Sequence, residues 1–390
     1  MPPRISHQIA VLGSGIGGST AARKLAESGM KVTVFECGFG VGGRTSTRIT
    51  RDEHRFAFDH GAQYISQAKS QPFALALAEW ESAGFLKEWK GRVANATSLS
   101  VTNDGASNII YKDAGSKIRY VGYPAMNSIC TNLLDHENIE IVTQTRACAT
   151  YNDIIGRWLL TSHGDRRELG QFEWLVAGDR LSATNNRADL RNAPLSDFKT
   201  EVEQIASVPI LVLMVALESP LDEIPFDGIT FDEESGEFGS LGWLARDTSK
   251  PGRGRKDGAE CWVVQSGPKA AKRILDSTVD EVNFEKRREL VREMTKETLL
   301  KDFMATIPKL STSSEPIPRV LSAVGHRWSA AFPSVPKSSD GEQDYSANID
   351  HKFVACGDYL GKLTGRIEGA YISGASAAAA LLDAQAKDEP

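Results

Sequence analysis

QIAVLGSGIGGSTAARKLAESGMKVTVFE, residues 8–36, is the stretch that sets the architecture of this chain. It opens with an apolar run from Gln8 to Leu12 and continues into a glycine loop. Apolar residues then recur at helical spacing from Ser19 to Ser28. β-Branched and aromatic residues alternate from Lys31 to Phe35, which predicts a second strand. Strand, glycine turn, helix and strand form most of one βαβ unit, so we predict an α/β domain of the Rossmann type.

The glycine loop carries the first functional signal. Gly13-Ser14-Gly15-Ile16-Gly17-Gly18 has the spacing G-x-G-x-x-G, in which glycines permit a tight turn and let backbone N–H groups approach a pyrophosphate. In a chain with 34 glycines, this hexapeptide alone is also compatible with a plain loop. Glu36 ends the second predicted strand, where a carboxylate can accept hydrogen bonds from the ribose hydroxyls of an adenosine. Together these residues predict a dinucleotide site.

The next segment favours FAD over NAD. Val41-Gly42-Gly43-Arg44 follows Glu36 closely and adds a second glycine pair with a guanidinium. Here the chain resembles the amine oxidase superfamily of FAD enzymes, in which G-G-R supplies further pyrophosphate contacts. The resemblance gives that role to Gly42, Gly43 and Arg44, and the planar fork of arginine suits it. It implies FAD that is bound without a covalent link.

The carboxyl-terminal segment supports the same cofactor. Residues 353–358 read as a strand that ends in Gly357-Asp358, and Glu368-Gly369-Ala370 opens an alanine-rich helix. In FAD enzymes of this shape, the Gly-Asp carboxylate meets the ribityl or phosphate region. The helix amino terminus points at the flavin, where negative charge develops on reduction. Plain packing of the helix is the alternative.

Within that superfamily the chain resembles the renalase family, through FDHGAQY (58–64) and LGWLARDTSKPGR (241–253). This resemblance places Gly61, Ala62, Gln63 and Tyr64 along the flavin. It makes Trp328, in His326-Arg327-Trp328, a wall of the pocket. The alternative for Tyr64 and Trp328 is an ordinary place in the core.

Gln265 marks a departure from that family. It lies in CWVVQ (261–265), where many renalases carry an active-site histidine. Glutamine can donate and accept hydrogen bonds but cannot titrate, so either the histidine is dispensable for proton transfer or the substrate differs. Tyr64, Gln265 and Trp328 are the candidate catalytic residues, and no metal site is expected. The candidate cofactor-binding residues are Gly13, Ser14, Gly15, Ile16, Gly17, Gly18, Glu36, Gly42, Gly43, Arg44, Gly61, Ala62, Gln63, Tyr64, Ala147, Gly357, Asp358, Glu368, Gly369 and Ala370.

The length of 390 residues predicts two domains. We assign residues 1–66, 120–185 and 315–390 to the FAD-binding domain, and 67–119 and 186–314 to a mixed-sheet α+β substrate domain. Further elements are expected from composition and spacing: helices at 71–86, 196–206 and 279–303, a helix that follows Tyr123-Pro124 and ends at Leu134, strands at 139–142, 157–161, 174–177, 210–217 and 261–265, and a turn at 103–105. The charged loop from Asp247 to Gly258 is expected to be a mobile surface excursion.

Composition narrows the possible partners and the compartment. A net charge of −6 argues against a nucleic-acid binder. Five scattered cysteines favour a reducing compartment, and residues 1–7 lack a signal-peptide layout, so we expect an intracellular, cytoplasmic protein. The longest central apolar run, Ile210 to Leu217, is too short to cross a membrane.

The resemblance implies oxidation of a reduced, flat heterocycle by hydride transfer to flavin, with O2 as acceptor. In the renalase family this heterocycle is an isomeric dihydronicotinamide of NAD(P). One alternative is an amine or polyamine oxidase, which a cluster of carboxylates near the flavin would favour; an aromatic slot with a phosphate-binding arginine would favour a dinucleotide. The other alternative is a flavin-binding regulatory protein without activity, for which Gln265 is the best support.

Overall fold

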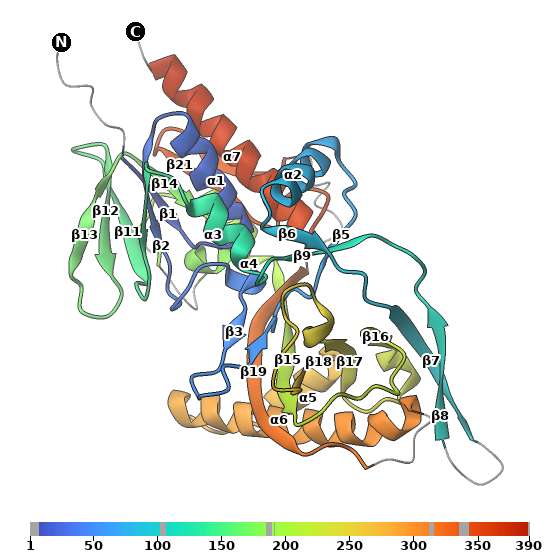
Figure 1. Ribbon diagram of the computed structural model, residues 1–390. Helices are drawn as coiled ribbons and strands as arrows, with labels where there is room; N and C mark the ends of the chain where they lie inside the picture. The colour runs from blue at the N-terminus through green and yellow to red at the C-terminus, as the bar shows by residue number, and fades with distance from the viewer. Residues whose placement is uncertain are drawn as a thin grey trace.

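The computed structural model describes residues 8–101, 107–184, 189–190, 192–311, 316–334 and 343–388. It contains a Rossmann-type domain and a second domain built on a larger mixed sheet (Figure 1). The predicted fold class is therefore confirmed. The predicted turn at 103–105 lies outside the described residues.

The first domain is built on a six-stranded sheet in the order β10-β2-β1-β14-β21-β20. Its first five strands are parallel, and only the edge strand β20 is antiparallel. Four predicted strands have the observed bounds. The six strands are β10 (Ile139–Val142), β2 (Lys31–Phe35), β1 (Gln8–Leu12), β14 (Trp174–Ala177), β21 (Phe353–Ala355) and β20 (Ser346–Asn348).

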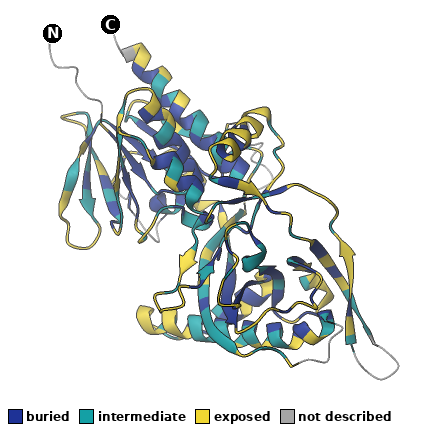
Figure 2. Ribbon diagram, viewed as in Figure 1, coloured by how far each residue is buried: buried dark blue, intermediate teal, exposed yellow. Residues whose placement is uncertain are grey.

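Both faces of this sheet are covered, so its central strands β1, β14 and β21 are almost wholly buried (Figure 2). Helices α1 (Ile16–Glu27), α3 (Ser128–Leu134) and α7 (Ile367–Asp388) lie on one face, where Val11 and Val34 pack against apolar residues of α1 and α7. An antiparallel sheet covers the other face. Its strands are β11 (Ala147–Asn152), β12 (Arg157–Ser162) and β13 (Glu168–Phe172).

Two glycines let α1 approach its neighbours closely. A Cβ on Gly18 would lie 2.1 Å from the Gly13 carbonyl oxygen, and a Cβ on Gly374 of α7 would lie 2.3 Å from that of Gly17. Any side chain at either position would therefore displace backbone. The last glycine of G-x-G-x-x-G thus serves the packing of helix on strand.

The second domain is built on a seven-stranded sheet in the order β19-β15-β18-β17-β16-β7-β8, in which only β16 and β7 pair in parallel. Helices α5 (Pro268–Asp276) and α6 (Phe284–Leu310) cover one face. The short strands β3 (Arg48–Ile49) and β4 (Ala57–Phe58) lie by the other. The seven strands are β19 (Val320–Ser334), β15 (Ala206–Leu217), β18 (Glu260–Ser266), β17 (Leu241–Arg246), β16 (Gly228–Phe231), β7 (Val93–Val101) and β8 (Ser107–Asp113).

A small sheet lies where the chain passes between the two domains (Figure 1). It consists of β5 (Ile65–Ser66), β9 (Arg119–Gly122) and β6 (Leu86–Glu88). Helix α2 (Gln71–Ser82) precedes β6 and packs against α7 through Phe73 and Tyr371, whose ring centroids are 5.4 Å apart. Aromatic residues of this region form one core with Trp243 of β17.

Helix ends differ from the sequence-based prediction for local reasons. The helix predicted at 71–86 ends at Ser82, because Gly84 takes a positive φ of 86° and turns the chain into β6. The helix predicted at 279–303 begins only at Phe284, where the Asn283 side chain caps the Lys286 N–H (3.0 Å). The predicted 196–206 helix ends at Glu203 as α4 (Ser196–Glu203).

No helix in the described ranges is long and apolar enough to cross a bilayer.

Two segments lie apart from the domain to which the sequence assigned them. Residues 320–334, expected in the FAD-binding domain, form β19 and pair along β15 in the seven-stranded sheet. Helix α4, expected in the substrate domain, packs through Phe198 and Val202 onto the core of the Rossmann-type domain. The remaining domain boundaries stay a prediction.

A buried histidine, His60, and a half-buried one, His326, lie where β4 and β19 approach each other. The His60 and His326 ring centroids are 4.7 Å apart. Burial and, to a smaller extent, the positive charge of Arg48 together lower the pKa of His60 to about 4. Burial likewise lowers the pKa of His326 to about 3. Both imidazoles are therefore neutral in the folded protein at neutral pH.

We expect this pair to make the fold sensitive to acid. Below about pH 6.5 the unfolded chain binds protons that the folded protein does not, so stability falls as the pH drops toward about 4, by up to about 1.4 kcal/mol per pH unit for each histidine. Urea unfolding of the holoprotein at pH values across this range should show that the free energy of unfolding depends less steeply on pH for His326→Asn than for wild type. The exposed His163 provides the control variant His163→Asn. Parallel profiles for wild type and His326→Asn would contradict the assignment.

Candidate functional site

The turn between β1 and α1 forms an open cradle of backbone. Gly13 has a positive φ of 91°, and Gly15 is the N-cap of α1 and provides no side-chain hydrogen bond to the helix. A Cβ on Gly15 would meet nothing within 4 Å, and one on Gly43 would lie 3.4 Å from the Gly15 Cα. The two glycine loops therefore lie close together, and the amino terminus of α1 at Gly15 borders open space. This arrangement fits a pyrophosphate.

Glu36 lies beside this cradle, at the end of β2. Its buried carboxylate accepts hydrogen bonds from the Ser14 N–H (3.1 Å) and hydroxyl (2.5 Å) and from the Gly38 N–H (2.6 Å). It thus ties the first glycine loop to the end of β2 and presents negative charge where an adenosine ribose would bind. Ala147 begins β11, two residues after Thr145, whose N–H donates to the Glu36 carbonyl (2.9 Å).

Arg44 and Asp358 connect the two ends of the chain at this cradle. The guanidinium donates two hydrogen bonds to the Asp358 carboxylate, at 2.7 and 2.6 Å, and one to the Ala331 carbonyl at 3.0 Å. Burial alone would lower the pKa of Arg44, but Asp358 raises it. The sequence assigned these two residues to separate parts of the cofactor, whereas in the structure they bind each other as a bidentate pair.

A cavity of about 550 Å³ lies between the two domains, which is the size range of small-molecule sites. Six of the predicted site residues line it: Gly61, Ala62, Gln63, Tyr64, Gln265 and Glu368. The full lining consists of Gly61, Ala62, Gln63, Tyr64, Ile65, Ser66, Phe73, Trp243, Gln265, Phe332, Pro333, Thr364, Gly365, Arg366, Ile367 and Glu368.

Aromatic rings form one wall of this cavity. The Tyr64 ring centroid lies 5.9 Å from that of Trp243 and 6.2 Å from that of Trp89. Trp243 and Gln265 are register partners on the adjacent strands β17 and β18. Sequence reasoning named Trp243 only as part of a motif, and its role as a wall comes from this register.

Trp328, the third candidate catalytic residue, lies outside the set of described residues that line the cavity. Its indole N–H donates to the His60 carbonyl (2.9 Å), and its ring stacks on the His60 imidazole at 5.1 Å. It also packs in the core beneath β15 and β18. Trp328 therefore supports the backbone next to Gly61.

Glu368 is the carboxylate of the cavity, and its charge is already engaged. It accepts hydrogen bonds from the Lys69 N–H (3.0 Å) and from the Ser70 N–H and hydroxyl (both 2.7 Å), at the start of α2. Gly369 follows it in α7, and a Cβ there would lie 2.1 Å from the Leu363 carbonyl oxygen. Ala370 is buried in the aromatic core.

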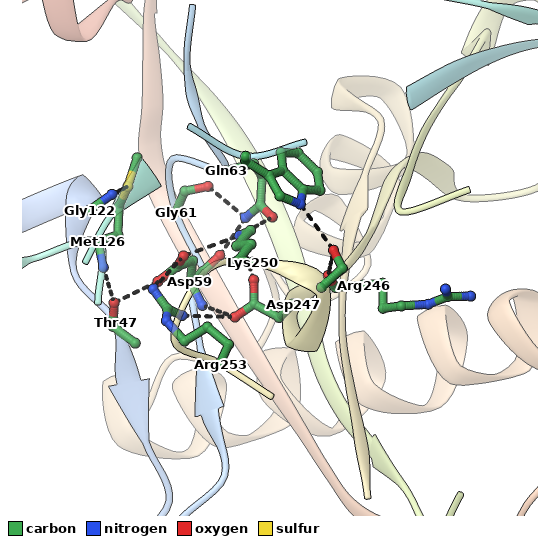
Figure 3. A network of polar contacts seen from close by, with 12 residues as sticks. Thr47, Asp59, Gly61, Gln63, Gly122, Met126, Arg246, Asp247, Lys250 and Arg253 are labelled. Atoms are coloured by element: carbon green, nitrogen blue, oxygen red, sulfur yellow. Dashed lines mark hydrogen bonds and ion pairs between the residues drawn. The ribbon is translucent and has the colours of Figure 1, made fainter. Parts of the chain in front are cut away.

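Four charged side chains that the sequence did not bring together form a buried cluster (Figure 3). Lys250 lies between Asp59 (3.1 Å) and Asp247, and Arg253 donates to both oxygens of Asp59 at 3.0 Å. The Thr47 hydroxyl donates to Asp59 as well (2.6 Å). The Lys250 side chain has no exposed surface. The expectation of a mobile surface loop at 247–258 is therefore wrong for its first half, because Asp59 neutralises these cations.

The cluster acts on the carboxylates in opposite directions. Burial tends to raise the pKa of Asp59, but Lys250 and Arg253 hold it below its ordinary value. Burial raises the pKa of Asp247, and the neighbouring Asp59 adds to this effect. The only local sign of the cluster was the aspartate that precedes Gly61 in FDHGAQY.

The cluster also orders the segment that lines the cavity. Lys250 Nζ lies 3.5 Å from Gln63 Oε1, and the Gln63 amide donates to the Gly61 carbonyl (3.1 Å). The Gln265 amide donates to the same carbonyl at 2.8 Å. Gln63 and Gln265 are thus held on one backbone oxygen, with Lys250 behind them.

Replacing Lys250 by methionine should destabilise the protein by about 3–5 kcal/mol, because two buried carboxylates would then share one arginine. Lys272→Met is the matched control: Lys272 pairs with Asp276 at 2.8 Å, but the side chains are 72% and 64% exposed. That variant should cost less than about 1 kcal/mol. Urea unfolding of both variant holoproteins gives their free energies of unfolding. Equal losses of stability in the two variants would contradict the importance assigned to the buried cluster.

Glu36→Ala should weaken FAD binding at least about tenfold, because a hydrogen bond to a charged acceptor contributes about 1.5–3 kcal/mol and about 1.4 kcal/mol is tenfold. Glu36→Gln keeps one acceptor oxygen and should fall between this variant and wild type. Glu27→Ala is the control, because it removes an exposed carboxylate at the end of α1. Titration of apoprotein with FAD gives the dissociation constants, and an unchanged value for Glu36→Ala would refute the ribose assignment.

Comparisons with known proteins agree with this geometry. Residues 11–79 match the family described as NAD(P)-binding Rossmann-like domain, and residues 279–382 match flavin containing amine oxidoreductase. The structure is similar to cyclohexylamine oxidase from Brevibacterium oxydans IH-35A, with a TM-score of 0.66, 13% identity, and coverage of 98% of this chain and 100% of that one. It is also similar to an oxidoreductase from Methanosarcina mazei, with a TM-score of 0.61, 14% identity, and coverage of 96% and 100%. It is similar as well to putrescine oxidase bound to putrescine, with a TM-score of 0.59, 12% identity, and coverage of 97% of this chain and 99% of that one. The fold and the two partial family matches identify the chain as an FAD-dependent oxidoreductase with the architecture of the flavin-containing amine oxidases.

Proposed function

We propose that the protein oxidises a reduced, flat heterocycle, an isomeric dihydronicotinamide of NAD(P), with FAD as hydride acceptor and O2 as final acceptor. In the overall reaction the dihydronicotinamide, O2 and one proton give NAD(P)+ and H2O2. The charge of the cavity carries this proposal. Of the described residues that line it, Arg366 and Glu368 alone are ordinarily charged, and Glu368 already accepts backbone N–H donors.

The shape of the cavity supports a flat ring. Tyr64 and Trp243 form an aromatic wall, and ring faces at such a wall favour an offset-stacked or edge-on aromatic partner. Bound FAD supplies the hydride-accepting ring. The glycine cradle, Glu36, Arg44 and the Asp358 region would hold its dinucleotide part.

Gln265 has the right chemistry to orient this substrate. Its amide nitrogen donates to the Gly61 carbonyl, which leaves Oε1 as an acceptor at the cavity. Loss of hydride from a dihydronicotinamide gives an aromatic pyridinium, and no proton has to be removed from the ring. A side chain that cannot titrate is therefore compatible with the reaction. We propose that Tyr64 and Gln265 contact substrate and that Trp328 acts through the His60–Gly61 backbone.

The alternative is an amine or polyamine oxidase, which the fold likeness to putrescine and cyclohexylamine oxidases favours. A cationic amine calls for a carboxylate that is available in the cavity. Glu368 is engaged with α2, and Arg366 has no ion-pair partner among the described residues, so the local charge is unfavourable to a cation. A cytoplasmic location is part of the same proposal, because reduced dinucleotides are found there.

Anaerobic rapid mixing of the holoprotein tests this function. The 2- and 6-dihydro isomers of NAD(P) should reduce the flavin faster than ordinary NADH and NADPH, and putrescine or cyclohexylamine should reduce it slowly or not at all. Rapid reduction by an amine without a response to the isomers would establish the amine oxidase alternative. Absence of reduction by every compound would favour a regulatory flavoprotein.

Two variants in the same assay test the role of Gln265. Gln265→His should change the limiting reduction rate by less than about tenfold, or about 1.4 kcal/mol in barrier. Gln265→Ala should mainly weaken substrate binding, on the order of 1 kcal/mol for a lost neutral hydrogen bond. A hundredfold faster reduction by Gln265→His would instead indicate that the wild-type pocket is impaired.

A further inference from the structure

We propose that Arg119 is a specificity-determining residue that binds an anionic group of the substrate, the pyrophosphate arm of a dinucleotide. The inference rests on the proposed function and extends it to the part of the substrate that does not react. Its starting point is an unusual buried charge beside the aromatic wall.

Arg119 lies next to the cavity, on β9. Its register partner on β5 is Ser66, which lines the cavity. Its guanidinium carbon lies 5.6 Å from the Tyr64 ring centroid, and its carbonyl accepts the backbone N–H of Trp89 at 2.7 Å. The backbone of Arg119 is therefore fixed to that of Trp89, and its guanidinium lies against the ring of Tyr64.

The guanidinium of Arg119 has fewer hydrogen-bond partners than those of the other buried arginines of the described chain. Arg253 donates to Asp59, and Arg180 donates to the Ile205 carbonyl (3.0 Å) and to the Ser207 hydroxyl (2.5 Å). Arg119 is only 6% exposed, yet the one hydrogen bond of its guanidinium in the described residues runs from Nη1 to the Lys117 carbonyl (3.2 Å).

No carboxylate in the described part of the chain lies within ion-pair distance of Arg119. Asp113, an acid close enough to influence it, is exposed and pairs with Arg92 at 3.2 Å. A buried arginine without a counter-ion costs free energy unless a ligand supplies the partner. Its planar fork is suited to two oxygens of one phosphate.

These observations fit one mode of substrate binding. The flat ring lies in the cavity beside Tyr64 and Gln265, and the anionic arm extends past Tyr64 to the guanidinium. Such a contact leaves the reacting atoms untouched, so it governs affinity and selection among substrates. It also disfavours small cationic amines, which would meet a second uncompensated positive charge.

The test compares Arg119→Gln with wild type on two substrates that share the reacting ring: a dihydronicotinamide dinucleotide isomer and the corresponding uncharged dihydronicotinamide riboside. We expect the dissociation constant for the dinucleotide to rise about tenfold or more, as for loss of a charge-assisted contact, with the riboside within about twofold of wild type. The limiting reduction rates should stay similar. Arg119→Lys should retain part of the affinity.

Arg92→Gln is the matched control, because it removes the same charge from an exposed arginine nearby and should leave both constants unchanged. Equal weakening of dinucleotide and riboside by Arg119→Gln would mean that Arg119 only holds Tyr64 in place, and would overturn the inference. No effect on either substrate would overturn it as well.

Binding of ADP-ribose separates this inference from the proposed reaction, because ADP-ribose carries the anionic arm but no reducing ring. Titrated into the holoprotein and followed by the flavin absorbance, it should bind to wild type and at least about tenfold more weakly to Arg119→Gln. If this difference appears while no dihydronicotinamide reduces the flavin, the anion site stands and the proposed reaction fails. If wild type does not bind ADP-ribose, the anion site itself is refuted.

Discussion

The ammonium of Lys250 has no exposed surface and lies between two carboxylates, Asp59 and Asp247, with Arg253 bound to the same Asp59. A buried charge of this kind is tolerated only when its partners are held in place, so the cluster forces the segments that carry them into one arrangement. Asp59 follows β4, and the other three residues follow β17 of the larger sheet. The cluster therefore ties the FDHGAQY segment to the second domain.

The geometry of the cavity depends on this connection. Gln63 is held by Lys250 from one side and by the Gly61 carbonyl from the other, and Gln265 of β18 donates to the same carbonyl. Trp328 adds a hydrogen bond to the preceding carbonyl, that of His60. The backbone beside the cavity is thus fixed from three directions, which is the rigidity that an orienting site requires.

The charged groups differ between the glycine cradle, where we propose that FAD binds, and the cavity, where we propose that the substrate binds. Around the glycine cradle the carboxylates have their partners, since Asp358 pairs with Arg44 and Glu36 accepts hydrogen bonds from Ser14, Cys37 and Gly38. Around the cavity the charges are not matched in this way, because Glu368 is engaged whereas Arg119 lacks a carboxylate partner within the described ranges. This difference is the basis on which we propose a substrate other than a cationic amine for an architecture shared with amine oxidases.

The residues of the Rossmann unit were predictable because their signals are local. Strand alternation at Lys31–Phe35, the turn that only glycine permits at Gly13, and the carboxylate of Glu36 at a strand end all depend on neighbours in the chain. The buried cluster, the placement of Trp328 beneath Gly61 and the uncompensated charge of Arg119 were not predictable in this way. Lys250 and Asp59 are 191 residues apart. Whether a charged loop is solvated or buried depends on which side chain, remote in the sequence, packs against it. That contact is decided by the tertiary fold and leaves no local signal in the sequence.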